Sequence, residues 1–252
     1  MKQKKTRGRQ LKKEILQLLH LEDIEEAITE IRRWPARQAV NPLFLLLCSM
    51  DERIRWNAVT LMGAVVCTLA EQELESARVV MRRCMWNLND ESGGIGWGCP
   101  EAMGEIMARN SDLAEHYRCI LLSYIQPDGN FLEHEDLQRG ALWGVGRLAH
   151  ARPSLLKGAA PYLYPFMQSD NGILRGLAVW AVGPLSEKNS VPMLKALSDD
   201  RFKLKLYREG HIIRCSVGQL SQEALLAHAQ YAIAQRNDDT KYPAAMRCYQ
   251  TM

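Results

Sequence analysis

The sequence predicts an all-α fold, a superhelix of stacked helix pairs that carries one small β-hairpin near the C-terminus. Three observations support this prediction. A helical template built around a glycine recurs about every 40 residues, an apolar segment of helical length precedes each copy, and the stretch RFKLKLYREGHIIRCS alternates near the end of the chain. Sequence periods of about 20–50 residues are typical of solenoids, in which each unit covers the apolar face of its neighbour.

The repeated template is a helix with one buried stripe. Its glycines are Gly63, Gly104, Gly146 and Gly183, with separations of 41, 42 and 37 residues. Positions −5, −1 and +2 from each glycine are small or apolar in every copy, which places them on one side of a helix. A glycine inside a helix costs about 1 kcal/mol relative to alanine. We therefore expect a neighbouring helix to pack against each glycine.

The partner helix of each pair is expected upstream of the template. The four segments with the right length and apolar content are 37–48, 72–88, 111–125 and 157–168. The joins CSMDERI and QSDNGIL are short and carry Ser, Asp and Asn, which favour helix starts. The prediction is a single repeat domain of five or six helix pairs over residues 10–235, between a basic arm at 1–9 and a tail at 236–252.

The template resembles a known repeat family. The residues from Arg55 to Gly63 and from Arg175 to Gly183 resemble HEAT repeats, especially the HEAT-like repeats of phycobilin-lyase-type and uncharacterised bacterial proteins. The segment WGCPEAMGEI is similar to one found in an uncharacterised bacterial family. The resemblance extends over about residues 35–232 and implies a right-handed superhelix whose second helices line a concave face. Such folds include bilin-chromophore lyases and base-excising DNA glycosylases, so the resemblance implies no single activity.

A β-hairpin is expected over about residues 202–215. Phe202, Leu204 and Leu206 alternate with Lys203, Lys205 and Tyr207. The turn is expected at Arg208-Glu209-Gly210, and the Ser-x-x-Gln spacing from Ser216 to Gln219 predicts a capping box that begins the next helix. The expected role of the hairpin is to cap the open end of the solenoid, and docking of a partner is the alternative.

The segment ESGGIGWGCP interrupts the second copy of the template. Pro100 falls where the other copies are well inside a helix, and proline is tolerated only in a first turn. This helix should therefore start late, with Cys99 near its N-cap, and the glycines are the joints of a loop that replaces the missing turn.

Three kinds of chemistry are conceivable for this loop and the linker that follows. A phosphate cradle is disfavoured because no Lys-Ser/Thr pair follows the glycines and Asp90, Glu91, Glu101 and Glu105 would repel an anion. A reactive Cys99 is disfavoured because the other copies have alanine there, which indicates a small core residue. The acids of LEHED at 132–136 are more typical of a solvated loop than of a metal site, so no metal and no cofactor are predicted.

The charge balance and the apolar content of the chain indicate which kinds of partner to expect. The chain has 252 residues, 32 Lys plus Arg and 29 Asp plus Glu, and a net charge of +3. A chain dedicated to nucleic acid is usually more basic, so nucleic acid is the less favoured partner. No apolar run approaches the ~20 residues that span a bilayer, and no signal-peptide core follows the basic start. We therefore expect a cytoplasmic protein without membrane contact, whose seven cysteines stay reduced.

A candidate binding surface follows from the template. Positions −7, −3 and +1 from each glycine share one side of the second helix. The candidate residues there are Trp56, Trp97, Glu101, Glu105, Arg139, Trp143, Arg147 and Trp180. Trp and Arg are enriched at binding hot spots, although tryptophan also fills grooves between helices, and the sequence leaves both interpretations open. The stripe is acidic in the second copy and basic in the third, which favours a protein partner with its own charge pattern over DNA.

Two functions are compatible with this surface. The first is a non-catalytic scaffold or adaptor that binds a protein or peptide in the concave groove. The alternative is an enzyme or cofactor-handling protein, bilin-lyase-like or DNA-glycosylase-like, that uses the same groove. For that alternative the candidate groups are the Glu101 carboxylate and, after it, Cys99.

Overall fold

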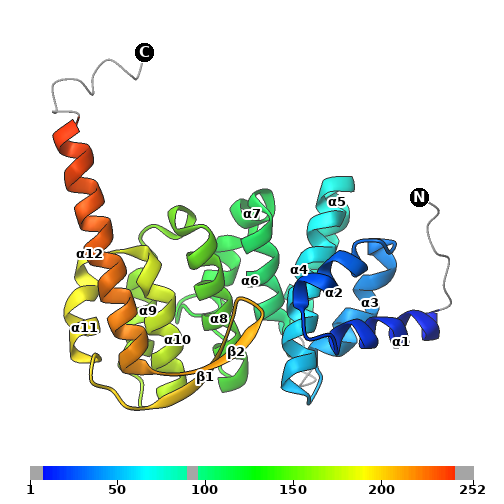
Figure 1. The fold of residues 1–252 in the computed structure, drawn as a ribbon, viewed down its shortest axis with the longest axis horizontal. Helices are drawn as coiled ribbons and strands as arrows, with labels where there is room; N and C mark the ends of the chain where they lie inside the picture. The colour runs from blue at the N-terminus through cyan, green and yellow to red at the C-terminus, as the bar shows by residue number, and fades with distance from the viewer. Residues whose placement is uncertain (1–7, 90–95, 242–252) are drawn as a thin grey trace.

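The computed structural model describes residues 8–89 and 96–241 and has the predicted architecture, a helical solenoid with one two-stranded sheet near the C-terminus. In Figure 1 the helices follow one another along the long axis, from α1 at one end to α12 at the other. Within these residues no helix combines the length and the apolar content needed to cross a membrane.

Two layers of helices form the body. The first helices of the pairs are α3 (Ala36–Leu47), α5 (Leu74–Leu88), α7 (Ser111–Ser123) and α9 (Ala160–Met167). The second helices are α4 (Glu52–Gln72), α6 (Cys99–Arg109), α8 (Glu135–Ala151) and α10 (Gly172–Val182). The second helices pack on one another in chain order and form a continuous inner layer. These eight helices are the ones that the repeat predicts.

The remaining elements close the two ends. They are α1 (Gly8–Leu19) and α2 (Ile24–Ile31), the 3₁₀ turns η1 (Pro153–Leu156), η2 (Gly183–Leu185) and η3 (Lys188–Ser190), α11 (Val191–Ala196), β1 (Lys203–Arg208), β2 (His211–Ser216) and α12 (Val217–Lys241). Residues 1–7 and 242–252 lie outside the described residues, and α12 continues past residue 235. The boundaries of the arm, the domain and the tail therefore stay predictions.

The helix starts follow from the capping residues in the sequence. Asp51 accepts hydrogen bonds from the first turn of α4, and Asn171 does the same for α10. In α6, Gly98 is the N-cap with φ 75° and Pro100 lies in the first turn, so this helix starts late, as expected. The predicted capping box is present, because the Gln219 side chain accepts from Ser216 N and the Ser216 side chain accepts from Gln219 N.

The template glycines are the points of closest approach between inner helices. A Cβ added to Gly104 would lie 2.3 Å from the Cα of Gly144, and one added to Gly146 would lie 2.5 Å from the Trp180 ring. The fourth glycine differs from the prediction. Helix α10 ends at Val182 and Gly183 opens the turn η2, because Pro184 has no N–H with which to continue the helix.

The hairpin has the predicted position in the chain. Strands β1 and β2 pair antiparallel from Lys203↔Ser216 to Arg208↔His211. Glu209 and Gly210 form the turn with φ 53° and 82°, the left-handed pair of a two-residue type I′ turn.

The location of the hairpin differs from the expected end cap, because it crosses the inner layer. Leu204 packs against Gly176 of α10, and Lys205 forms an ion pair with Glu52 of α4 at 2.6 Å. The turn reaches α2, where a Cβ on Gly210 would lie 2.6 Å from the Ile24 side chain. Figure 1 shows the strands running from the α10 end toward the N-terminal helices. The chain itself therefore covers part of the predicted binding face.

Candidate binding site

A row of aromatic rings runs along the inner layer. The ring centroids of Trp56 and Trp143 are 4.7 Å apart, and those of Trp143 and Trp180 are 6.1 Å apart. Trp143 and Trp180 are only 3% and 4% exposed, whereas Trp56 is half-buried. The sequence left two interpretations open for these tryptophans, a binding hot spot or a ring that fills the space between helices. Trp143 and Trp180 fill the space between helices, because neither ring is accessible to a partner.

Tyr207 of β1 joins the hairpin to this row. Its ring stacks on Trp56 with centroids 4.8 Å apart and an interplanar angle of 6°. Its hydroxyl lies 2.7 Å from Thr60 Oγ1, and its carbonyl accepts a hydrogen bond from Trp143 Nε1 at 2.9 Å. Burial raises the pKa of Tyr207 to about 12, so the phenol stays neutral at physiological pH. The hairpin is thus anchored to two inner helices by one residue, whose side chain contacts α4 and whose main-chain carbonyl is bonded to α8.

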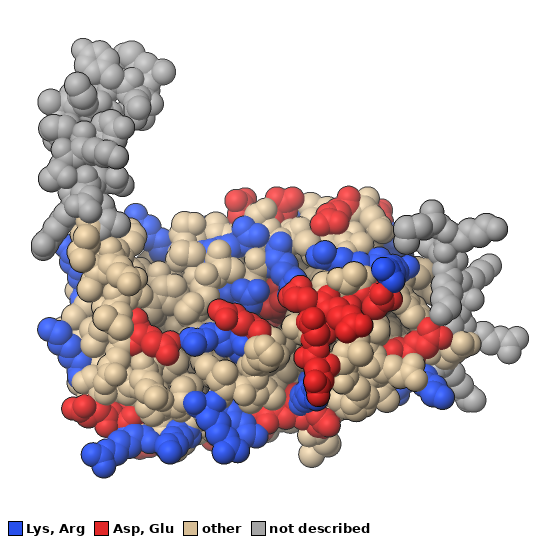
Figure 2. Space-filling model, in the orientation of Figure 1, with Lys and Arg blue, Asp and Glu red and all other residues tan. Residues whose placement is uncertain are grey.

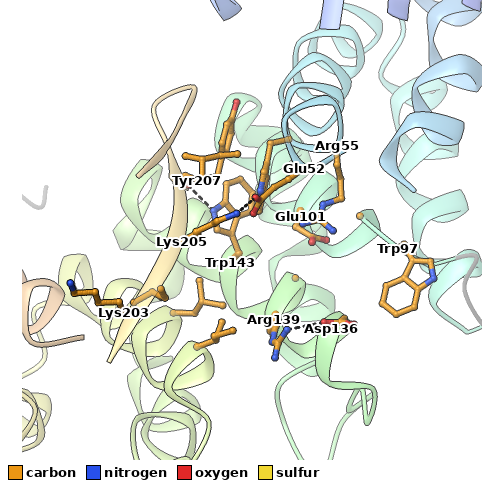
Figure 3. Close-up of a pocket in the computed structure, with 17 residues that line it drawn as sticks. Glu52, Arg55, Trp97, Glu101, Asp136, Arg139, Trp143, Lys203, Lys205 and Tyr207 are labelled. Atoms are coloured by element: carbon orange, nitrogen blue, oxygen red, sulfur yellow. Dashed lines mark hydrogen bonds and ion pairs between the residues drawn. The ribbon is translucent and has the colours of Figure 1, made fainter. Parts of the chain in front are cut away.

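The hairpin divides the inner face into two hollows. The first, here called the groove pocket, has a volume of about 460 Å³. It is lined by Glu52, Arg55, Trp56, Trp97, Gly98, Glu101, Asp136, Arg139, Gly140, Trp143, Ile173, Leu177, Lys203, Leu204, Lys205, Tyr207 and Ile212 (Figure 3). The second, the arginine pocket, measures about 440 Å³ and lies beside Glu105, Arg147 and Trp180. Both volumes lie in the usual range for ligand pockets, about 300–1,000 Å³.

Trp97 stands apart from the aromatic row. Its ring meets His134 edge to face at 4.8 Å, and it is partly exposed on the far side of the groove pocket from Lys205 (Figure 3). His134 is the N-cap of α8, where its ring accepts from Asp136 N at 3.3 Å. This histidine therefore supports Trp97 and the start of a helix, and among residues 8–89 and 96–241 no group of three or more potential metal ligands converges.

Most charges in the groove pocket have partners. Arg139 forms ion pairs with Glu135 and Asp136, and Lys205 forms one with Glu52. Glu101 and Arg55 lie side by side in Figure 3, yet within the described part of the chain Glu101 Oε2 and Arg55 Nε are buried without a hydrogen-bond partner. The pocket thus contains an acidic and a basic side chain that each have a buried polar atom without a hydrogen-bond partner.

Glu101 occupies a confined position. Its Oε2 is buried and has no hydrogen-bond partner. A Cβ on Gly140 would lie 2.5 Å from that oxygen, so a side chain at this position would displace the carboxyl group. Burial raises the pKa of Glu101 to about 7, against the opposing effect of Arg55, and Asp136 adds to the rise. A carboxyl group with this pKa is present in both protonation states near neutral pH.

Arg55 contrasts with the arginine at the equivalent position of the fourth copy. Arg175 binds Asp200 at 2.8 Å and donates to the carbonyls of Ser169 and Asp170. The Nε of Arg55 is instead buried without a partner, and its guanidinium lies 5.8 Å from the Trp56 ring centroid. Since buried polar atoms are nearly always hydrogen-bonded, an unpartnered guanidinium nitrogen in a pocket is a candidate ligand contact.

The arginine pocket has a different character because its central charge is satisfied. Glu105 is 3% exposed and accepts from Arg109 Nε at 2.5 Å and from Arg147 Nε at 2.6 Å. His150 stacks on Trp180 at 4.8 Å, and burial lowers the pKa of this histidine. The ion pair with Arg147 joins α6 to α8, whereas the pair with Arg109 lies within α6, so we assign this cluster to the packing of the repeats.

The eight predicted residues divide between the two pockets. Five line the groove pocket, namely Trp56, Trp97, Glu101, Arg139 and Trp143, and Trp143 also borders the arginine pocket together with Glu105, Arg147 and Trp180. Sequence reasoning did not include Arg55, Lys203, Lys205 or Tyr207 among the site residues. The sequence offered one indication, Tyr207, an aromatic residue on the side of the strand that also carries Lys203 and Lys205. A side that faced only water would not be expected to carry an aromatic ring.

Cys99 lies away from both pockets. It is 1% exposed and accepts a hydrogen bond from the Asn87 side chain at 3.7 Å. It is therefore a small core residue, in line with the alanines of the other copies. Residues 90–95 of the glycine-rich loop, which includes the disfavoured phosphate cradle, lie outside the described residues.

Comparisons with known proteins agree with the class of fold. A HEAT-like repeat model matches residues 135–185, from the start of α8 to the end of η2. The crystal structure of an engineered protein is similar at 16% identity and a TM-score of 0.50, with 88% of this chain and 97% of that chain covered. None of the curated proteins matches the chain. The match and the likeness define a helical repeat solenoid and assign no activity.

Designed armadillo repeat proteins match the structure with a lower TM-score. One is 17% identical with a TM-score of 0.47, and the alignment covers 85% of this chain and 98% of that chain. Another, solved in complex with the peptide (KR)4, is 18% identical with the same TM-score and coverage.

Proposed function

We propose that the protein is a non-catalytic scaffold that binds a protein or peptide segment in its concave groove, with the groove pocket as the point of contact. The observation that carries the proposal is the pair Arg55 and Glu101, since Arg55 Nε and Glu101 Oε2 are buried without a hydrogen-bond partner beside the partly exposed Trp56 and Trp97. A pocket with aromatic walls and a few unsatisfied polar groups has the usual composition of a recognition site.

The size and shape of the pocket favour a short segment. The groove pocket is bounded by β1 on one side and by α6 and α8 on the other, so an extended chain fits its outline better than a folded surface. Trp143 and Trp180 are excluded from direct contact by their burial, and we assign them to support of the pocket walls.

Peptide selection against the immobilised full-length chain tests the proposal. Selected peptides should bind the wild type and lose about 30-fold in affinity with Trp97→Ala, the loss typical of a tryptophan hot spot. Trp86→Ala is the matched control, because Trp86 is 82% exposed on α5, outside the groove. Failure to select any peptide, or equal affinities for the Trp97→Ala and Trp86→Ala variants, would contradict the proposal.

A second function is favoured by one observation. A buried carboxyl group with a pKa of about 7 is suited to general acid–base catalysis at neutral pH, and Glu101 has that property. The corresponding proposal is a glycosylase-like activity in which Glu101 acts on a base held among the aromatic rings. Duplex DNA that carries damaged bases should then release them with the wild type and not with Glu101→Gln. Absence of release from the wild type would remove this candidate.

A further inference from the structure

One edge of the hairpin borders the groove pocket with free backbone groups. In a hairpin with a two-residue turn, the residues that flank the turn, here Arg208 and His211, form a hydrogen-bonded pair. From there along the strands, non-hydrogen-bonded pairs alternate with hydrogen-bonded ones. The N–H and C=O groups of Lys203, Lys205 and Tyr207 therefore point away from β2. The Tyr207 carbonyl confirms this direction, because it accepts from Trp143 Nε1 across the edge.

Beyond Tyr207 the same edge is open. Lys203 and Lys205 both line the groove pocket, and within the described residues no hydrogen bond from outside the hairpin is made to the main chain of either residue. An edge strand with unpaired N–H and C=O groups is the template onto which an extended peptide adds as a further strand.

The charge of the pocket favours an acidic segment. Of its four cationic side chains, Arg139 and Lys205 are held in ion pairs, whereas Arg55 and Lys203 have none within the described residues. Three carboxyl groups line the same pocket, but two of them, Asp136 and Glu52, belong to those ion pairs. The four basic side chains of the lining exceed its three carboxyl groups, Glu52, Glu101 and Asp136, by one, so the net charge of the lining is positive.

The surface around the hairpin has the same sign. Arg201, Lys203, Lys205 and Arg214 are exposed on or next to the strands, and Figure 2 shows basic side chains along the lower edge, where Figure 1 places the hairpin. A separate acidic band covers the region of α2, where Glu22, Asp23, Glu25 and Glu26 are exposed. An acidic ligand would be attracted to the hairpin side and repelled from the α2 side.

The unpartnered polar atoms of the pocket favour a peptide over a nucleic-acid backbone as the ligand. The buried Glu101 Oε2 lacks a hydrogen-bond donor, and the Nε groups of Arg55 and Arg139 lack acceptors. A peptide main chain offers N–H donors together with C=O acceptors, whereas a phosphodiester backbone offers acceptors alone. The apolar wall of Ile173 and Leu177 further suits an aliphatic side chain.

We propose that the groove pocket binds an acidic, extended peptide segment that pairs with the outer edge of β1 and places carboxylates on Arg55 and Lys203. This inference rests on the proposed peptide-binding function and specifies the chemistry of the partner.

A set of matched peptides tests the inference on the full-length chain. The probe is a fluorescein-labelled eight-residue peptide in which Asp and Glu alternate with Leu and Val. Its two comparison peptides replace the acids by Asn and Gln or by Lys and Arg. Fluorescence anisotropy should show at least tenfold weaker binding for both, the loss expected when a charge-assisted hydrogen bond is removed.

Variants locate the site. Arg55→Gln and Lys203→Gln should each weaken binding of the acidic peptide about tenfold. Neither should unfold the protein, because the buried Arg55 Nε has no hydrogen-bond partner among the described residues and Lys203 is exposed on the strand. Arg118→Gln on α7 is the matched control and should leave the affinity unchanged. A version of the peptide with N-methylated main-chain groups should also bind at least tenfold more weakly, because it cannot pair with β1.

The outcomes separate this inference from the proposal on which it rests. Equal or tighter binding of the amide or basic peptide would overturn the acidic partner and leave peptide binding intact. Binding of none of the three peptides, together with failure of the peptide selection, would overturn both. A single-stranded oligonucleotide that displaces the acidic peptide, with the same loss in Arg55→Gln, would overturn the peptide in favour of a phosphate ligand.

Discussion

Glu101 and Glu105 lie one turn apart on α6, on the same side of the helix, and their surroundings are opposite. Glu105 is held by two guanidinium groups, whereas Glu101 faces the groove pocket with a buried oxygen that has no partner. An ion pair stabilises the charged form of a carboxyl group and desolvation destabilises it. The two residues therefore have different roles, one in packing and one in the proposed binding site.

The first prediction concerns the protonation of Glu101. The folded state raises its pKa from 4.5 to about 7, so the folded protein binds the proton more tightly than the unfolded chain. The stabilising contribution is complete below pH 4.5 and is lost as the pH rises to about 7. Glu101→Gln should remove this dependence, which amounts to about 3 kcal/mol between pH 4 and pH 8. Urea unfolding of both proteins across that range measures the difference.

The control for this measurement is an exposed carboxyl group. Glu115→Gln on α7 should keep the wild-type pH profile. Equal pH profiles for the wild type and Glu101→Gln would show that Glu101 is not desolvated in solution.

The second prediction concerns Glu105. Glu105→Gln loses the charge in both of its hydrogen bonds to arginine, and the partly exposed Arg109 and Arg147 can turn to water. We expect a loss of about 2 kcal/mol in the free energy of unfolding at pH 7, the usual value for a hydrogen bond to a charged group. An unchanged unfolding midpoint would argue against a packing role for this cluster.

At the scale of the elements, contact between α6 and α8 is set by two glycines. Backbone meets backbone there, since a Cβ on Gly104 would lie 2.3 Å from Gly144 Cα and 2.6 Å from its carbonyl oxygen. Neither atom belongs to a flexible side chain, so the helices must separate to admit a methyl group. The repeat period thus has a direct physical cause in the approach of consecutive inner helices.

The third prediction tests that contact. Gly104→Ala should lower the free energy of unfolding by about 3 kcal/mol, the upper part of the range for overpacked cores. Gly183→Ala is the matched variant, because its nearest neighbour, Ala224 Cβ, would lie 3.2 Å away and can shift. We expect Gly183→Ala to change stability by less than about 1 kcal/mol. Chemical unfolding of both variants gives the comparison, and equal losses would contradict the close approach.

At the scale of the whole molecule, the hairpin links distant parts of the chain. Repeat proteins are normally held together by contacts between neighbouring units. Here Tyr207 bonds to Thr60, 147 residues earlier in the chain, and the turn at Gly210 packs on Ile24 of α2. The C-terminal hairpin therefore connects the N-terminal helices to the rest of the solenoid, which favours cooperative unfolding of the array.

The fourth prediction is that Tyr207 carries much of this connection. Tyr207→Ala should cost about 3–5 kcal/mol, as for other buried aromatic residues, and Tyr207→Phe about 1 kcal/mol for the lost hydrogen bond to Thr60. Hydrogen exchange should become faster in α2 and α4 with Tyr207→Ala, because their contact with the hairpin is weakened. Tyr231→Ala, on the exposed side of α12, is the control. Unchanged exchange in α2 and α4 would show that the hairpin does not couple the two ends.

The helical repeat, the order of its elements and the presence of a hairpin can all be predicted from the amino-acid sequence. These features depend on local rules: apolar spacing along a helix, capping at Asp51 and Asn171, and the exclusion of Pro100 from a helix interior. The sequence also indicated the stripe from which all eight candidate residues come, because residues one turn apart share a side of a helix.

The accessibility of those residues and the location of the hairpin depend on contacts between distant segments and could not be predicted in this way. Trp143 and Trp180 are covered and Trp97 is not, because exposure depends on neighbours from other repeats and on a hairpin that folds back over the inner layer. The unpartnered state of Arg55 likewise could not be read from the template, since Arg175 occupies the equivalent position and is fully paired. Pairing between segments far apart in the chain is a property of the folded arrangement, and local sequence rules do not encode it.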